Sequence, residues 1–132
     1  MSAKTSTRIC IIDDDDAVRD SLSELLRAHG YDVCDFPSAL AYLNGGARNK
    51  AFDCAIVDLH MPGMSGLELL DTVQKRTASL PVVMITGRTD SALKERARRR
   101  GVVAVLDKPI AESALLAAIT KANSARTDRG HT

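Results

Sequence analysis

Carboxylates that close two apolar runs are the residues of this chain whose type and spacing could do chemistry. Asp58 closes the run 55–57, and the residues from Asp13 to Asp16 close the run 9–12. An ionised carboxylate at the end of a buried strand is costly unless it has a partner or a function. Two such strands side by side would place an acidic pocket at one edge of a sheet.

The chemistry that fits this pocket is binding of a hard divalent cation. Asp13, Asp14 and Asp58 would crowd together, and like charges that close raise one another's pKa unless a cation is present. Mg²⁺ is bound by one or two carboxylates with waters and phosphate oxygens, whereas Ca²⁺ usually needs more protein oxygens. Zn²⁺ would prefer His or Cys, and only His60, two residues after Asp58, is expected near the pocket. The pattern therefore favours Mg²⁺.

Thr86 and Lys108 extend this pocket toward phosphoryl transfer. Each follows an apolar run, and a hydroxyl and a cation are the groups that stabilise phosphoryl oxygens. One carboxylate would then act as the nucleophile and form an aspartyl phosphate.

Five apolar runs alternate with segments of helical period. Strands are expected at 8–13, 32–36, 52–58, 80–86 and 102–106. The first helix would start at an Asp16 N-cap and stop before Gly30, and the second would run over 39–43. A Ser65–Glu68 capping box opens the third, the fourth runs from 89–91 to Arg100, and the last from Glu112 to about Asn123.

Continuous apolar strands alternating with helices predict a doubly wound α/β domain with a parallel sheet. Ligands of such sheets bind outside the carboxyl ends of the strands. Asp13, Asp58, Thr86 and Lys108 all fall at or just after such ends, which brings the candidate residues to one site.

Length and composition indicate one globular domain. The chain has 132 residues, 45% hydrophobic and 27% charged, with a formal net charge of +1. We expect a domain over 8–123, a disordered N-terminus over 1–7, and a flexible tail or the start of a linker over 124–132. Bulk charge gives no argument for nucleic acid, no run reaches the ~20 apolar residues of a membrane span, and the N-terminus lacks a signal-peptide core. A cytoplasmic protein is expected.

Three cysteines lie in or beside strand candidates. Cys10, Cys34 and Cys54 are read as reduced core residues. A metal site is the alternative, although there is no C-x-x-C pair and no evident fourth ligand.

Taken together, these motifs resemble a response-regulator receiver domain of two-component signalling, from about Arg8 to Ala122. The matching pieces are the acidic pair Asp13-Asp14, Asp58 in DLHMPGMSG, Thr86-Gly87 and Lys108-Pro109. The phrases VMITG and MPGMSG look most like the FixJ-type subgroup. The resemblance implies the flavodoxin-like, CheY-like fold with strand order 2-1-3-4-5 and five helices.

The resemblance also implies residue roles. Asp58 would accept a phosphoryl group from a histidine kinase or phosphotransfer protein. Asp13 and Asp14 would bind Mg²⁺ together with Asp58 and the backbone carbonyl of His60. Thr86 and Lys108 would contact the phosphoryl group, and the Lys108-Pro109 peptide would be cis. Such a domain is a signalling phosphoacceptor rather than an enzyme, with self-phosphorylation and self-dephosphorylation as its only activities.

The output is less defined. In the family, the fourth helix, fifth strand and fifth helix form the usual protein output face, and phosphorylation-dependent dimers are possible; no nucleic-acid contact is expected from the domain itself. The basic residues at 94–100 are either a solvated helix end or a partner surface. Many receivers have Tyr or Phe three residues before the lysine, and this chain has Val105, so the usual relay by ring rotation is absent.

Three hypotheses stay open. The chain is a free-standing receiver, or a receiver cut from a DNA-binding transcription factor, or a Mg²⁺-dependent phosphohydrolase of similar topology. The last class pairs its nucleophile with an Asp two residues later. Asp58 is followed at that spacing by His60, but Asp13 is followed by Asp15.

Overall fold

The structure, a computed structural model, describes residues 7–46, 51–76, 80–87 and 91–130. The proposed cap residues Thr89 and Asp90 and most of the expected disordered N-terminus lie outside these ranges. Within them, β-strands and helices alternate along the chain, as the hydrophobic pattern predicts.

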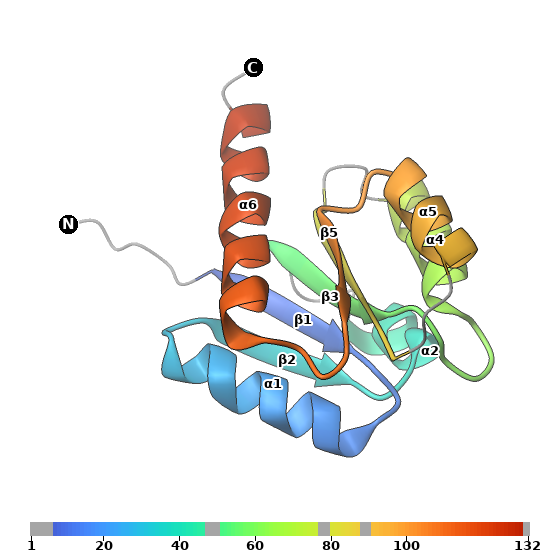
Figure 1. Cartoon of the computed structure of the whole chain (residues 1–132), viewed down its shortest axis with the longest axis horizontal. Coiled ribbons are helices and arrows are strands. Elements are labelled where there is room, and N and C mark those ends of the chain that lie inside the picture. Colours follow the sequence, from blue (N-terminus) through green and yellow to red (C-terminus); the bar gives the residue numbers. More distant parts are fainter. Residues whose placement is uncertain (1–6, 47–50, 77–79, 88–90, 131–132) are drawn as a thin grey trace.

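A parallel five-stranded sheet in the described residues forms the centre of the molecule (Figure 1). Its order is β2-β1-β3-β4-β5, with every neighbouring pair parallel, which confirms the expected order. The strands are β1 (Arg8–Ile12), β2 (Asp32–Phe36), β3 (Cys54–Asp58), β4 (Val82–Thr86) and β5 (Ala104–Asp107). They are shorter than expected by one or two residues at some ends, because apolar residues such as Phe52 and Leu80 lie just before the paired segment.

Five helical segments in the described residues connect or follow the strands. They are α1 (Asp16–Ala28), α2 (Ala39–Ala41) continued by the π-helical turn η1 (Tyr42–Gly46), α4 (Gly66–Arg76), α5 (Ser91–Arg99) and α6 (Glu112–Gly130). The fold is therefore the doubly wound α/β arrangement that the sequence predicts.

Two hydrophobic cores lie on opposite faces of the sheet. On one face α1 and α6 pack through Leu22, Leu26, Leu115 and Ile119. On the other face α2, α4 and α5 supply the remaining core, and Val105 packs against it. Because helices cover both faces, the strands are buried on both sides, which explains their continuous apolar sequences.

Several helix boundaries differ from the expected ones, and two of these differences have a clear cause. The N-cap of α1 is Asp15, not Asp16, because the Asp15 side chain accepts hydrogen bonds from Ala17 N and Val18 N. The helix α6 ends at Gly130 rather than near Asn123. No proline or glycine interrupts the chain between these two points, so nothing stops the helix there. The segment 124–130 is helical rather than an irregular tail; the domain boundaries themselves stay a prediction.

Two further expectations concern membranes and cysteines. No helix in the described part of the chain is long and apolar enough to cross a bilayer. The three cysteines form no disulfide, and Cys10 and Cys54 are buried in cores on opposite faces of the sheet. Burial raises the pKa of Cys54 to about 12, so this thiol is protonated. Among the described residues the candidate metal-binding group contains no cysteine, so the cysteine metal site is wrong.

Candidate functional site

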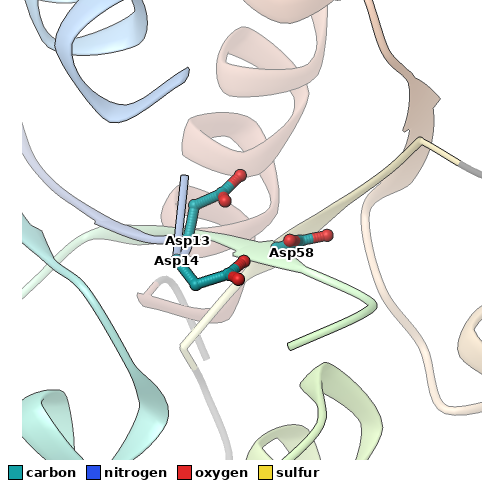
Figure 2. Close-up of side chains that lie close together, drawn as sticks. All are labelled: Asp13, Asp14 and Asp58. Atoms are coloured by element: carbon teal, nitrogen blue, oxygen red, sulfur yellow. The ribbon is translucent and has the colours of Figure 1, made fainter. Parts of the chain in front are cut away.

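Three carboxylates meet at the carboxyl edge of the sheet (Figure 2). Asp13 and Asp14 directly follow β1, and Asp58 is the last residue of β3, which lies next to β1. Each residue offers an oxygen, and these oxygens lie within 4.8 Å of one another. Asp13 is 0% exposed and Asp58 is 3% exposed, whereas Asp14 faces solvent. The sequence prediction that these residues share one pocket is correct.

Backbone amides hold the two buried carboxylates in place. Asp13 Oδ1 accepts a hydrogen bond from Asp15 N at 2.8 Å, and Asp13 N donates to Phe36 O on β2 at 3.2 Å. Asp58 Oδ1 accepts a hydrogen bond from His60 N at 3.2 Å. These bonds leave the second oxygen of each carboxylate directed at other groups of the pocket.

Lys108 brings a positive charge into the pocket. Its Nζ lies 3.0 Å from Asp13 Oδ2 and 3.5 Å from Asp58 Oδ2. Its backbone N–H donates to Thr86 O at 2.8 Å, and the following Lys108-Pro109 peptide is cis, as the resemblance implies. Thr86 is 1% exposed and ends β4, directly opposite Asp107. All of the side chains predicted to contact a phosphoryl group therefore lie at the same edge.

The electrostatics of the pocket favour a cation. Burial raises the pKa of Asp58 to about 6, and the neighbouring charge of Asp13 adds to this effect, while His60 N and Lys108 oppose it. Burial alone would lower the pKa of Lys108, but contacts with Asp13 and Asp58 outweigh it and raise this pKa. One lysine thus offsets only part of the negative charge of three carboxylates.

The donor set fits a hard divalent ion. Asp13 Oδ2 is buried and lies 3.0 Å from the Lys108 ammonium, with no other polar partner among the described residues. A buried carboxylate oxygen with so few partners, next to two further carboxylates, is a suitable ligand for a cation. The acidic group is therefore consistent with a metal site built from Asp13, Asp14 and Asp58.

The remaining candidates lie around this centre. His60 N contacts Asp58, but whether the His60 carbonyl binds metal stays a prediction. The His60 side chain lines a cavity of about 460 Å³ together with Asp14, Ser65 and Leu93, and its buried Nε2 has no hydrogen-bond partner in the segments that the structure describes. Asp15 and Asp16 do not belong to the carboxylate group. They cap and begin α1, as expected of residues at a helix N-terminus.

Sequence reasoning missed one residue that contacts the acidic loop. Arg19 on α1 donates from Nη1 to the carbonyl oxygen of Asp13 at 2.7 Å. It also pairs with Asp16 and, from Nε at 3.5 Å, with Asp35 of β2. The signal in the sequence is the i,i+3 spacing of Asp16 and Arg19, which predicts the first pair but not the contact with the loop.

Comparison with known proteins gives one family. The model of the response regulator receiver domain matches residues 9–120 of the chain. The transcriptional regulatory protein FixJ of Azorhizobium caulinodans is 38% identical over 125 residues, which are 95% of this chain and 59% of that protein. The response regulator protein TodT of Pseudomonas putida is 38% identical over 122 residues, 92% of this chain and 53% of that protein.

Solved structures agree with the fold. The crystal structure of a CheY-like receiver domain protein from Methanospirillum hungatei matches with a TM-score of 0.86 and 30% identity. The match covers 94% of this chain and 99% of that one. The chain thus spans a little over half the length of the two curated relatives but nearly all of this receiver structure.

Proposed function

Because the chain belongs to the response regulator receiver domain family, we propose that Asp58 accepts a phosphoryl group from a histidine kinase or phosphotransfer protein. The domain is a signalling phosphoacceptor of a two-component system, and a histidine kinase is the partner that this family implies. We further propose that Asp13, Asp14, Asp58 and the backbone carbonyl of His60 hold Mg²⁺ during the transfer.

Each residue of the pocket has a part in the proposed transfer. An oxygen of Asp58 attacks phosphorus, the P–O bond of the aspartyl phosphate forms, and the P–N bond of phosphohistidine breaks, leaving its electron pair on the imidazole. Lys108 and Thr86 contact the phosphoryl oxygens. Bound Mg²⁺ would neutralise the charge of these oxygens. Water attacking the same phosphorus breaks the O–P bond to Asp58 and releases inorganic phosphate and the free carboxylate, so self-dephosphorylation accompanies self-phosphorylation.

The observation that carries this proposal is the environment of Asp58. It is a nearly buried carboxylate at the end of β3, grouped with two further carboxylates and 3.5 Å from a lysine ammonium. A carboxylate in such a place has little role in folding, because burial raises its pKa and its charge opposes the fold. A reactive role explains why the residue is there.

Incubation with acetyl phosphate and Mg²⁺, followed by intact mass measurement, tests the proposal. We expect one added phosphoryl group on the folded protein, and none when Mg²⁺ is chelated. Asp58→Asn should stay unmodified, because an amide oxygen is a poor nucleophile. Asp107→Asn is the matched control, since Asp107 also ends a strand at this edge but lies outside the acidic group.

The opposite result would be equally clear. A folded wild-type protein that gains no mass, or an Asp58→Asn variant that is modified like the wild type, would contradict Asp58 as the acceptor. Loss of modification in Asp107→Asn alone would point to a different carboxylate.

A phosphohydrolase is the alternative function from another class. It would use Asp13 as nucleophile and Asp15 as acid or base. Asp15 instead caps α1, with its Oδ1 bonded to Ala17 N and Val18 N at 2.9 and 3.3 Å. Because its Oδ1 already accepts these two hydrogen bonds, Asp15 is poorly suited to an acid–base role. Many turnovers per protein on small phosphate esters would favour the hydrolase over the receiver.

We place the output face on α5, β5 and α6. Within the basic segment 94–100, Lys94, Arg98, Arg99 and Arg100 each pair with an acidic side chain, which supports a solvated helix end. Either an effector domain elsewhere in a longer chain, as in a transcription factor, or a separate protein would bind this face.

Phosphorylation-dependent dimerisation and a cytoplasmic location belong to the same proposal. A cytoplasmic location suits the reduced state of the three cysteines.

A further inference from the structure

One guanidinium group contacts the loop that carries Asp13 and Asp14 and two further segments of the molecule. Arg19 lies in the second turn of α1, and its side chain is 13% exposed. Its Nη1 donates to Asp13 O at 2.7 Å, while Nη2 pairs with Asp16 and Nε lies 3.5 Å from Asp35 on β2. A single planar group thus contacts the loop, the first turn of α1 and the neighbouring strand.

The bond to Asp13 O fixes the peptide group that joins the two metal-ligand candidates. The carbonyl of Asp13 and the N–H of Asp14 belong to the same planar peptide unit, so fixing one fixes the other. Every other polar atom of Asp13 is held as well: its N by Phe36 O, its Oδ1 by Asp15 N, and its Oδ2 by the charge of Lys108. Within the described part of the chain Asp14 has no comparable support of its own, and it faces solvent. Its position next to Asp58 therefore depends on the peptide unit that Arg19 holds.

We propose that Arg19 is a positioning residue for the cation site, holding the Asp13–Asp14 peptide unit so that both carboxylates stay beside Asp58. This inference rests on the proposed function, because it assumes that the three carboxylates bind Mg²⁺. Groups that orient metal ligands without touching the metal commonly change metal affinity by about 10- to 100-fold when removed.

The charge of Arg19 and its proposed positioning role predict opposite changes in Mg²⁺ affinity when the residue is removed, so a binding measurement distinguishes the two effects. As a positive charge near the carboxylates, Arg19 repels a cation, so removing it should strengthen Mg²⁺ binding. As a positioning group, it organises the ligands, so removing it should weaken binding. Lysine keeps the charge but has no planar fork with which to contact three partners at once.

The experiment measures the Mg²⁺ dissociation constant of the whole 132-residue chain by calorimetry for three variants. We expect Arg19→Gln to raise this constant about tenfold and Arg19→Lys to fail to restore the wild-type value. Arg27→Gln is the matched control. Arg27 lies on the same helix, about 12 Å away along its axis, and also donates to a backbone carbonyl, Val33 O at 3.0 Å. Its loss should leave the constant within about twofold of wild type, since it lies far from the ligands.

A second readout is independent of the metal. In metal-free protein, the ¹⁵N–¹H resonance of Asp14 should shift in both Arg19 variants and stay in place in Arg27→Gln. Urea unfolding of each variant confirms that it is folded, and Asp35→Asn, which removes one partner of Arg19 outside the acidic loop, should shift the Asp14 resonance in the same direction.

The outcomes distinguish this inference from the proposed function. Wild-type protein that binds no Mg²⁺ would overturn both. Tighter or unchanged binding in Arg19→Gln, or full recovery in Arg19→Lys, with normal binding in the wild type, would overturn the positioning role alone. An equal loss of affinity in Arg27→Gln would also overturn it, because the effect would then be one of helix stability.

Discussion

At the scale of single residues, the function that we propose for Asp58 opposes stability. The carboxylate is nearly buried, and burial together with the charge of Asp13 raises its pKa from 3.8 to about 6. Between these two pH values the folded state binds a proton that the unfolded state has lost. The free energy of unfolding therefore falls as pH rises through this range. The loss of stability reaches its full size above about pH 6.

Asp58→Asn should remove this cost. In the absence of Mg²⁺ we expect the variant to exceed the wild type in free energy of unfolding by about 1 to 3 kcal/mol at pH 8. The difference should shrink as pH falls from 6 to 4, because the wild-type carboxyl becomes neutral there. Urea unfolding at several pH values measures it. A difference that is the same at pH 4 and pH 8 would show that the ionisation of Asp58 is not its cause.

At the scale of elements, the junction of β3 and α4 depends on a close approach that only glycine permits. A Cβ added at Gly66 would lie 2.4 Å from Asp58 O and 2.9 Å from Leu59 Cα. Both atoms belong to the backbone and cannot move without moving Asp58. The same glycine donates from its N–H to Leu59 O at 3.2 Å, which closes the loop that follows the phosphoacceptor candidate.

Gly66→Ala should therefore lower both stability and phosphorylation. We expect the free energy of unfolding to fall by about 1 to 3 kcal/mol, the usual cost of overpacking, and the rate of modification by acetyl phosphate to fall with it. Gly45→Ala is the control, because a Cβ there has no neighbour within 4 Å and alanine favours helix by up to about 1 kcal/mol. A Gly66→Ala protein as stable and as reactive as the wild type would refute the close approach.

The proposed function also requires a route from the pocket to α5, which belongs to the same scale. Val105 packs beside α5 but has no ring to rotate. Lys94 of α5 instead pairs with Asp107 of β5 at 2.6 Å, and Asp107 directly precedes Lys108, whose ammonium contacts Asp58. This ion pair joins α5 to the residue next to the pocket, so a shift of Lys108 on phosphorylation would reach α5 through it.

Lys94→Met should weaken that coupling without changing the chemistry. We expect unchanged modification of Asp58 but a smaller phosphorylation-induced shift of the Ala97 amide resonance, because a partly exposed ion pair contributes about 0.5 to 1 kcal/mol. Arg98→Met is the control, since the partner of Arg98 among the described residues, Glu95 at 3.8 Å, lies in α5 itself. If the Ala97 shift is as large in Lys94→Met as in the wild type, α5 is coupled by another route.

The same elements show why parts of this structure could be predicted from sequence. Strand ends can be predicted because apolar runs stop where carboxylates begin, and parallel topology then brings Asp13 and Asp58 together without any knowledge of contacts. Helix ends can be predicted only where the sequence holds a stop signal. The end of α1 before Gly30 was predicted correctly, whereas α6 continues to Gly130 because its polar residues carry no such signal.

Contacts between distant elements could not be predicted in this way. The bond of Arg19 to Asp13 O and the pair of Lys94 with Asp107 depend on how helices sit over the sheet. Many cationic side chains on a helix have acidic residues within reach in sequence, so spacing alone does not select the partner. The one-residue error at the N-cap of α1 has a similar origin, because four consecutive aspartates all suit a cap and only the backbone conformation at Asp15 decides.

At the scale of the whole molecule, the acidic group joins segments that belong to both cores. Ile12 before Asp13 packs on the face of α4 and α5, and Ile56 of β3 packs on the face of α1 and α6. A cation held between β1 and β3 would therefore stabilise the central strands on which both cores depend. Binding to the folded state alone raises the free energy of unfolding by RT ln(1 + [Mg²⁺]/Kd), about 1.4 kcal/mol at ten times Kd.

Mg²⁺ should accordingly shift the urea midpoint of the whole domain upward at pH 7 without changing the slope of the transition, since the surface exposed on unfolding stays the same. The shift should shrink at pH 5, because Asp58 takes up a proton near pH 6 and a protonated carboxyl is a poor ligand. Asp14→Asn should lose most of the shift, and NaCl at equal ionic strength should not reproduce it. An equal effect of NaCl, or a full effect in Asp14→Asn, would mean that Mg²⁺ acts by general charge screening and not by binding among the three carboxylates.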